Sequence, residues 1–233
     1  MKHILFLLFT LVTIASCRST TGSGKLITQT RPAGNFDGIN VSGDFEVEVK
    51  IGTGTSVVIE ADDNIMKYIE TTTAGSTLKI YTEGLHNYSD VHMKVYITTP
   101  SLKKINASSS ADVMVEQPLV STDKLVFKAS SGSEIKTEVD APEVSADASS
   151  GATISLHGKT RSYYAESSSG ADIKSWDLLS ENTTVSVSSG ASAKVHASIK
   201  LNATASSGAS ISYHGAANVV KSVSSGASVE KRD

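Results

Sequence analysis

The sequence predicts an all-β protein, most of which forms a parallel β-solenoid with coils of 18–22 residues. Three observations support this prediction. A Ser-Ser-Gly-Ala unit recurs along the second half of the chain, the residues around each copy alternate between apolar and polar, and β-branched residues dominate these segments. Self-similarity at a fixed short period indicates stacked repeats, each of which buries its apolar face against its neighbours.

The repeat keeps both its spacing and its phase. Around one copy, Val144, Ala146, Ala148, Ile154 and Leu156 share a parity, and the same parity is apolar around the other copies. A slip of one residue would turn the apolar set outward, so this agreement indicates strands in vertical register. With neighbouring strands about 4.8 Å apart, seven rungs predict a rod about 30 Å long. The repeat glycines lie 18–20 residues apart, at Gly132, Gly151, Gly170, Gly190, Gly208 and Gly226.

The second serine of each unit has the parity of the apolar face. We therefore expect these serines to form an internal ladder of hydrogen-bonded hydroxyls, because a buried hydroxyl needs a partner. The glycine has outward parity and is expected to mark a bend with positive φ. The motif is thus interpreted as structural rather than catalytic. The serines are Ser131, Ser150, Ser169, Ser189, Ser207 and Ser225.

The chain begins with an export signal. Residues 1–16 contain one basic residue, Lys2, followed by a short apolar run that ends in small residues. The next residues, "IASC", resemble a bacterial lipobox, in which Cys17 becomes the lipid-bearing first residue of the mature chain. Residues 17–24 then form a flexible polar tether. We expect a membrane anchor at Cys17, and the sequence leaves open which face of the outer membrane the protein occupies.

Composition limits the possible chemistry. Cys17 is the only cysteine, so no disulfide, thiol nucleophile or zinc cluster is expected. The formal charge is −3, or −4 once Lys2 is removed with the signal. This mild negative charge argues against nucleic acid or an anionic membrane surface as a partner. No cofactor motif is present, and we expect none to be bound.

Two regions are predicted after the tether. Residues 25–106 alternate less regularly, as in "FEVEVKI", and we expect a partly antiparallel β section that closes one end of the solenoid. Residues 107–233 carry the repeats and are expected to continue from that section. An open terminal coil is an aggregation edge, and the charged tail "VEKRD" is interpreted as its guard.

The first of these regions resembles a known family. "NFDGINVSGDFEVEVKIGTG", with Gly38, Ile39 and Asn40 at its centre, followed by "VVIEADDNIMKYIET" and "STLKIYTEG", is similar to the head GIN domain of autotransporter adhesins. The resemblance extends from about residue 25 to the C-terminus. It implies a right-handed parallel β-helix, a lipoprotein of the Bacteroidetes type and a role in adhesion. The family supplies no catalytic residues to carry over.

An enzyme remains an alternative, because hydrolysis of a glycosidic bond needs two carboxylates close together on one surface. The best acidic candidates are Asp147, Glu166 and Asp172. Counted from the glycine of each coil, Asp147 and Glu166 are expected to lie out of register. Asp172 shares a position with Asp112, but Glu134 and Thr153 lie between them. We therefore interpret these residues as a solvated face.

The histidines suggest no defined site. His157 and His214 each precede a glycine and have outward parity. His86 and His92, with Asp90 between them, form a weak candidate metal site, for which surface polarity is the preferred interpretation.

Two surfaces are candidates for binding. The first serines of the units form an outward hydroxyl stripe, interpreted as a featureless flank. Tyr163, Tyr164 and Trp176 cluster in one coil and its exit, and aromatic rings there could stack on a sugar, although Tyr163 has core parity. The stripe consists of Ser108, Ser130, Ser149, Ser168, Ser188, Ser206 and Ser224.

Taken together, these features predict a non-catalytic, lipid-anchored β-helical protein of the cell envelope that acts as an adhesin or ligand-binding protein. A glycan or a matrix protein is the expected partner besides the membrane. A polysaccharide lyase or hydrolase and a structural spacer of the envelope remain the alternatives.

Overall fold

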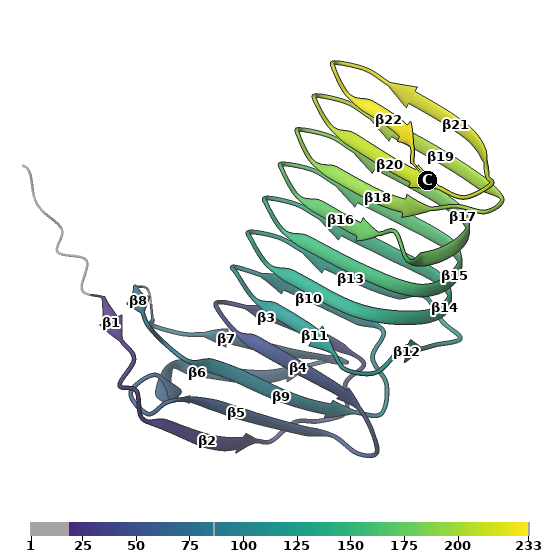
Figure 1. Ribbon diagram of the computed structural model, residues 1–233. Coiled ribbons are helices and arrows are strands. Elements are labelled where there is room, and N and C mark those ends of the chain that lie inside the picture. Colours follow the sequence, from purple (N-terminus) through teal and green to yellow (C-terminus); the bar gives the residue numbers. More distant parts are fainter. Residues whose placement is uncertain (1–18, 86, 233) are drawn as a thin grey trace, which may run out of the picture.

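Stacked parallel coils make up most of the computed structural model, which describes residues 19–85 and 87–232 (Figure 1). In each coil a strand of one sheet leads through a tight corner into a strand of a second sheet. The strands after the corners form the front sheet, which faces the viewer in Figure 1, and the strands before the corners form the back sheet. This arrangement is the β-solenoid that the sequence predicts.

The front sheet contains, from the N-terminal end upward, β2 (Leu26–Arg31), β5 (Ser56–Asp62), β9 (Met93–Thr99), β4 (Glu46–Ile51), β11 (Asp112–Val115), the first halves of β14 (Glu134–Ala148) and β15 (Thr153–Ser167), β16 (Asp172–Ser175), β18 (Ser192–His196), β20 (Ser210–His214) and β22 (Ser228–Lys231). The back sheet contains β6 (Ile69–Ala74), β7 (Thr77–Thr82), β3 (Gly38–Ser42), β10 (Lys104–Ser108), β13 (Leu125–Ala129), the second halves of β14 and β15, β17 (Leu178–Val187), β19 (Lys200–Ala205) and β21 (Asn218–Val223).

Four short elements lie outside these two stacks. The strand β12 (Leu119–Val120) pairs with the middle of β14 on a narrow third side of the rod. Near the N-terminus β1 (Thr20–Thr21) pairs with β8 (Tyr88–Ser89). The 3-10 helix η1 (Met66–Tyr68) lies between β5 and β6.

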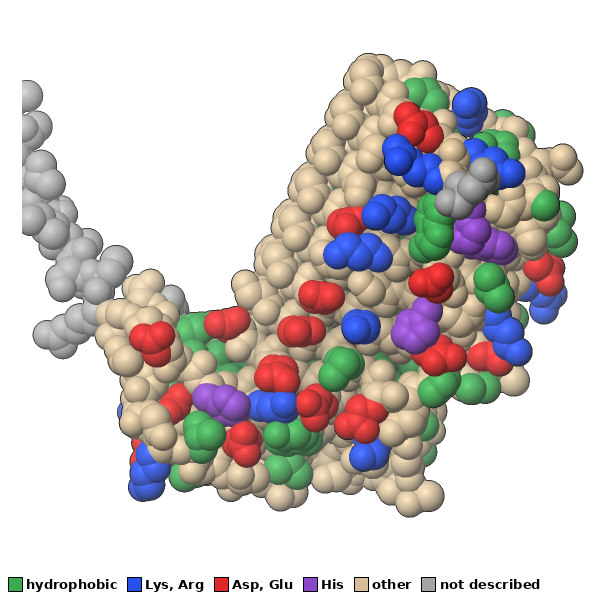
Figure 2. Space-filling view, in the orientation of Figure 1, with side chains coloured by type: hydrophobic (Ala, Val, Ile, Leu, Met, Phe, Trp, Pro, Cys, Tyr) green, Lys and Arg blue, Asp and Glu red, His purple; other side chains and the backbone are tan. Residues whose placement is uncertain are grey.

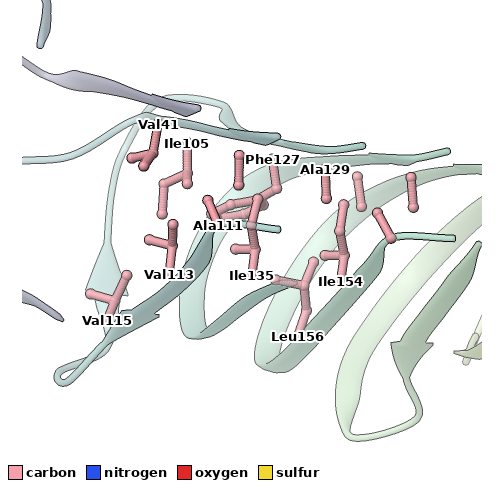
Figure 3. Close-up of a cluster of buried hydrophobic side chains, with 14 of the residues drawn as sticks. Val41, Ile105, Ala111, Val113, Val115, Phe127, Ala129, Ile135, Ile154 and Leu156 are labelled. Atoms are coloured by element: carbon pink, nitrogen blue, oxygen red, sulfur yellow. The ribbon is translucent and has the colours of Figure 1, made fainter. Parts of the chain in front are cut away.

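The core is a set of apolar columns in vertical register. On the front sheet, one inward column runs from Val113 through Ile135 to Ile154. On the back sheet, Ile105 pairs with Phe127. Figure 3 shows side chains of the two sheets facing each other across this interior. Because each rung pairs with the same position of the next, the alternation visible in the sequence becomes continuous apolar stacks.

The prediction that the second serines form an internal ladder is wrong. Ser131, Ser150, Ser169, Ser189, Ser207 and Ser225 are all exposed, with φ between 50° and 54°. The glycines that follow them, Gly132, Gly151, Gly170, Gly190, Gly208 and Gly226, have φ between 69° and 74°, as expected for a bend. Counting alternate residues assigns the second serine to the wrong face, because two successive residues with left-handed φ turn the chain sharply at the corner. The second serine therefore points outward. The alanine after the glycine is buried in most coils, for example Ala152.

A ladder does exist at the corners, but backbone groups form it. The N–H of Gly151 donates to the carbonyl of Ser169 at 3.1 Å, and the N–H of Gly170 donates to the carbonyl of Ser189 at the same distance. Within each corner the chain also closes on itself, as where the Ala152 N–H donates to the Ser149 carbonyl at 3.2 Å. Backbone groups therefore satisfy most corner polar groups, and at one corner the buried Ser133 Oγ also accepts from the Ser130 N–H at 3.0 Å.

The segment with Gly38, Ile39 and Asn40 forms β3, which stacks on β10 as a further coil. Ile39 is fully buried, whereas Asn40 is half-buried. The parallel stack therefore starts well before the first Ser-Gly unit, and residue 106, the expected boundary, lies inside β10.

Antiparallel strands close the N-terminal end of the rod. Both β2 with β5 and β6 with β7 are antiparallel pairs. The segment that carries η1 crosses from the front sheet to the back sheet there and buries Ile65, Met66 and Ile69. In the described part of the chain, no helix has the length and apolar character needed to cross a membrane.

Candidate ligand-binding face

Outward side chains of the front sheet form columns because the coils are in register. One column contains Lys136, Ser155, Lys174, Lys194 and Ser212. A second column, two positions further along each strand, contains Glu138 paired with His157, and His196 paired with His214. Functional side chains on this face therefore come from residues about one coil apart in the sequence.

Trp176 lies at the end of β16, beside the imidazoles of the second column. The ring centroids of Trp176 and His214 are 4.2 Å apart, and those of His196 and His214 are 4.7 Å apart in an edge-on arrangement. Trp176 is half-buried, so part of its ring stays accessible. The Nδ1 atom of His214 is buried without a hydrogen-bond partner among the described residues.

Buried hydroxyls hold His196 in place. The backbone carbonyl of His196 accepts hydrogen bonds from Ser180 Oγ at 2.8 Å and Thr183 Oγ1 at 2.7 Å. The Ser180 N–H donates to His196 Nδ1 at 3.1 Å. Burial lowers the pKa of His196, and the neighbouring His214 lowers it further. We did not predict this network from the sequence, although serine and threonine at core positions of β17 could have indicated buried hydroxyls there.

A hollow of about 550 Å³ lies next to Trp176 and is lined by Trp176, Lys194, Ser212 and Arg232. We call it the front hollow. Its polar groups are an ammonium, a guanidinium and a hydroxyl, all of which donate hydrogen bonds. Figure 2 shows basic side chains gathered with histidines near the C-terminal end of this face. The front hollow therefore combines an aromatic surface with hydrogen-bond donors.

A second hollow, of about 560 Å³, opens at the third side of the rod. Its lining mixes charges of both signs, including Asp140, Lys159, Arg161 and Glu181. Lys159 is paired with Asp140 at 3.1 Å. His196 also lines this side hollow, but its charges are of both signs, so it favours an anionic ligand less than the front hollow does.

Acidic side chains gather on the lower part of the front sheet. Asp112 pairs in register with Glu46 on one side and Glu134 on the other, and the three line a hollow of about 230 Å³. Burial raises the pKa of Asp112, and the charges of Glu134 and Glu46 raise it further. Lys94 binds Glu46 at 2.6 Å and Glu48 at 2.8 Å, and these two bonds raise its pKa. We call Glu46, Asp112 and Glu134 the acid stack.

The acidic candidates from the sequence are placed differently from what was expected. Asp147 and Glu166 pair in register on the back sheet, which contradicts the expected offset, because each lies four residues before the glycine of its coil. Lys128 pairs with Asp147 at 3.2 Å. Asp172 accepts a hydrogen bond from Ser192 Oγ at 2.5 Å and lies in register with Thr153, in the column of the acid stack.

The three aromatic candidates do not form one patch. Tyr163 is fully buried, its hydroxyl lies 2.6 Å from Ser175 Oγ, and burial raises its pKa. Tyr164 points outward from the back sheet with 44% exposure, and Lys124 Nζ lies over its ring, 5.5 Å from the ring centroid. Only Trp176 contributes to the front sheet. Consecutive residues of a strand point to opposite faces, so Tyr163 and Tyr164 could not act together.

The other histidine candidates either lie near a carboxylate or fall outside the described residues. His157 lies 3.5 Å from Glu138, and His92 lies 2.9 Å from Glu60. His86 falls outside the described residues, as do the signal of residues 1–16 and Cys17. Across residues 19–85 and 87–232, no group of three or more His, Cys, Asp or Glu side chains is arranged to hold a metal ion.

Comparisons with known proteins agree on the fold. A structure described as a "putative adhesin" from Bacteroides fragilis NCTC 9343 superposes with a TM-score of 0.83 at 21% identity, over 91% of this chain and 99% of that chain. A "putative adhesin" from Parabacteroides distasonis ATCC 8503 gives 0.71 at 21% identity, over 92% and 100%. A "putative lipid binding protein" from the same strain gives 0.72 at 18% identity, over 93% and 100%.

At these identities the structural likeness establishes the fold alone. A comparison with curated proteins finds no match. The family model described as "Putative auto-transporter adhesin, head GIN domain" matches residues 35–217, which is most of the chain. The protein therefore belongs to the head GIN domain family of auto-transporter adhesins.

Proposed function

We propose that the protein is a non-catalytic, lipid-anchored adhesin of the cell envelope that binds an external ligand on its front sheet. Family membership supports an adhesin-like role at the envelope or cell surface. The observation that carries the proposal is the front hollow, where the accessible ring of Trp176 meets Lys194, Ser212 and Arg232. Such a combination of apolar surface and a few convergent polar groups is typical of ligand sites.

A binding array tests this function. A soluble form that starts at Ser19 contains every described residue and lacks Cys17. It should bind at least one glycan or matrix protein saturably, and lipid vesicles should be included because one structural relative is described as lipid binding. Absence of saturable binding to all of these probes would favour the structural spacer instead.

The anchor has its own test. Replacement of Cys17 with Ala should move the full-length protein from the membrane fraction to the soluble fraction, because the lipid-bearing thiol is lost. Replacement of Ser19 with Ala, just after the cysteine, should leave it membrane-bound. Immunoblots of the two fractions give the answer, and a Cys17→Ala protein that stays with the membrane contradicts the anchor.

One observation favours a second candidate function, a polysaccharide hydrolase. Asp112 and Glu134 are directly adjacent in register, and the raised pKa of Asp112 suits a general acid beside an ionised partner. Release of reducing ends from a polysaccharide by the soluble form, abolished by Asp112→Asn, would support hydrolysis. No release from any of the glycans that the protein binds would support the non-catalytic function.

A further inference from the structure

The ring of Trp176 gives the front hollow one flat apolar wall. Trp176 is the only tryptophan of the chain, and it both packs on His214 and lines the hollow. His214 in turn contacts His196, whose backbone is fixed by the hydroxyls of Ser180 and Thr183. The ring is therefore held in place before any ligand arrives, which lowers the entropy cost of binding. A flat aromatic wall of this kind suits the C–H face of a sugar ring.

The two cations of the front hollow, Lys194 and Arg232, differ in whether a carboxylate is paired with them. Among the described residues, Lys194 has no carboxylate within ion-pair distance. Arg232 pairs with Glu230 at 2.8 Å through one nitrogen, which leaves other N–H groups to donate. Ser212 lies in the same column between Lys194 and Glu230, the carboxylate that pairs with Arg232. Three donors, one of them an uncompensated ammonium, suit the oxygens of an anionic group.

Charge along the rod supports an anionic ligand at this end. Residues 172–233 contain six basic and five acidic side chains, and two of the basic ones, Lys200 and Lys221, belong to the back sheet, although the whole chain carries a formal charge of −3. The acid stack lies several coils away on the same sheet, toward the N-terminal end. In Figure 2 acidic side chains predominate low on the face, and basic side chains gather near its upper end beside a few acidic ones. An anion would be attracted to the C-terminal end and repelled from the rest of the face.

From this geometry we propose that the front hollow binds an acidic carbohydrate, a pyranose that carries a carboxylate or a sulfate. Trp176 stacks on the sugar ring, while Lys194, Arg232 and Ser212 donate to the anionic group. The hollow, at about 550 Å³, is within the usual range for small ligands. Inorganic phosphate would leave the aromatic wall unused. This inference rests on the proposed function, because it names the ligand class of the same site.

Matched probes test the charge requirement. Titration calorimetry of the soluble form that starts at Ser19 should detect oligogalacturonate but not its methyl ester, and heparin oligosaccharides but not their desulfated forms, if the hollow accepts both anions. Binding to either acidic probe alone still supports the proposal. Equal binding of the charged and neutral members of both pairs would overturn it.

Matched variants locate the site. Lys194→Glu should weaken binding about tenfold or more, because a charge-assisted bond is replaced by repulsion. Lys136→Glu, in the same column but beside the acid stack, should change affinity little. Trp176→Ala should weaken binding strongly, Trp176→Phe should retain part of it, and Tyr164→Ala on the back sheet is the aromatic control. Unchanged binding in both Lys194→Glu and Trp176→Phe would overturn the site.

The outcomes separate this inference from the proposed function. Loss of all binding on the array removes both. Saturable binding to a neutral glycan or a matrix protein, with none to the acidic probes, removes only the inference. Tighter binding to inorganic phosphate or phosphatidylglycerol vesicles than to the acidic sugars would show that the donors select phosphate rather than an acidic sugar. A folded state of each variant is confirmed by its circular dichroism spectrum.

Discussion

From Ser109 onward, each corner of the solenoid rests on two consecutive residues in the left-handed region of φ. In most coils these are Ser and Gly, as at Ser150 and Gly151, and the next N–H closes the turn on the carbonyl of the first serine. The arrangement has the sign pattern of a type I′ turn, which favours glycine at its central positions. The first corner departs from this pattern, because Ser109 is followed by Ser110, with φ of 68°, in place of glycine.

Ser110→Gly should therefore stabilise the protein. Holding a residue with a Cβ in the left-handed region costs about 1 kcal/mol, and glycine avoids this cost. We expect the free energy of unfolding to rise by about 0.5–1 kcal/mol in urea titrations. The reverse change one coil later, Gly132→Ser, should lower it by a similar amount, since a Cβ there meets no atom closer than 3.8 Å. A loss of stability in Ser110→Gly would contradict this account of the corner.

Corners also show where sequence reasoning succeeded and failed for single residues. The spacing of the corners and their positive φ could be predicted from the sequence, because glycine has few other reasons to recur at a fixed period. The face on which the second serine lies could not be predicted, because counting alternate residues assumes a straight strand and the chain bends at the corner. Buried hydroxyls do exist elsewhere: Ser175, Ser180 and Thr183 lie in strands, whereas Ser133 follows a corner glycine at the position that alanine occupies in most coils.

Between neighbouring strands, the parallel register decides which charges meet. It brings Glu46, Asp112 and Glu134 together although they are far apart in the sequence. Lys94, which pairs with Glu46, and Lys136, whose charge acts on Asp112, compensate part of this charge. Like charges directly opposite each other on neighbouring strands destabilise a sheet by a fraction of a kcal/mol. The raised pKa of Asp112 has the same cause, together with burial.

Asp112→Asn should raise the melting temperature at pH 7 by about 1–3 °C, since it removes one of the three charges and keeps the side-chain shape. Because the folded pKa of Asp112 lies above its unfolded value, ionisation opposes folding as pH rises through the folded pKa. The gain should therefore disappear near pH 3, where the wild-type side chain is protonated in both states. Thermal unfolding at several pH values measures this difference.

Asp147→Asn is the matched control for this prediction. Asp147 also lies on an outward column, but Lys128 compensates its charge at 3.2 Å. Its replacement should leave the melting temperature unchanged or slightly lower at pH 7. If Asp112→Asn and Asp147→Asn shift the melting temperature alike, the acid stack does not carry the effect.

Strand positions in the repeats were predictable because each coil repeats the last. The acid stack was only partly visible, since Asp112 and Glu134 share a repeat position whereas Glu46 lies in a coil without the Ser-Gly unit. Likewise, the pairing of β3 with β7 and of β4 with β9 inverts the sequence order of two coils. Such non-local pairings produce no repeat in the sequence. The N-terminal segments could therefore be predicted as strands, but their order in the stack could not.

Over the whole molecule, the two ends of the rod are unlike each other. The N-terminal end is closed by antiparallel strands and by the segment around η1, whereas the last coil, β21 with β22, has neighbours on one side only. Val220 and Val223 of β21 are exposed, by 64% and 45%. An unpaired edge with apolar side chains is a template for pairing with another chain.

Lys221 is positioned to prevent such pairing. It stacks on Ala203, a buried core position of the preceding coil, so a charge lies at the open end where the other coils bury an apolar residue. A second copy that docked on this end would have to bury that ammonium, at a cost of several kcal/mol unless it were paired. Charged residues pointing inward at a terminal strand are a known protection of sheet edges.

Lys221→Val should therefore promote end-to-end association. We expect sedimentation velocity to show a larger oligomeric fraction than for the wild-type soluble form at the same concentration, because the apolar columns of two rods can then meet. Lys200→Val removes the same charge from the outward face of β19, one coil inward, and should not change the sedimentation profile. Equal profiles for Lys221→Val and wild type would mean that the charged tail, with Glu230, Lys231 and Arg232, protects the edge without help from Lys221.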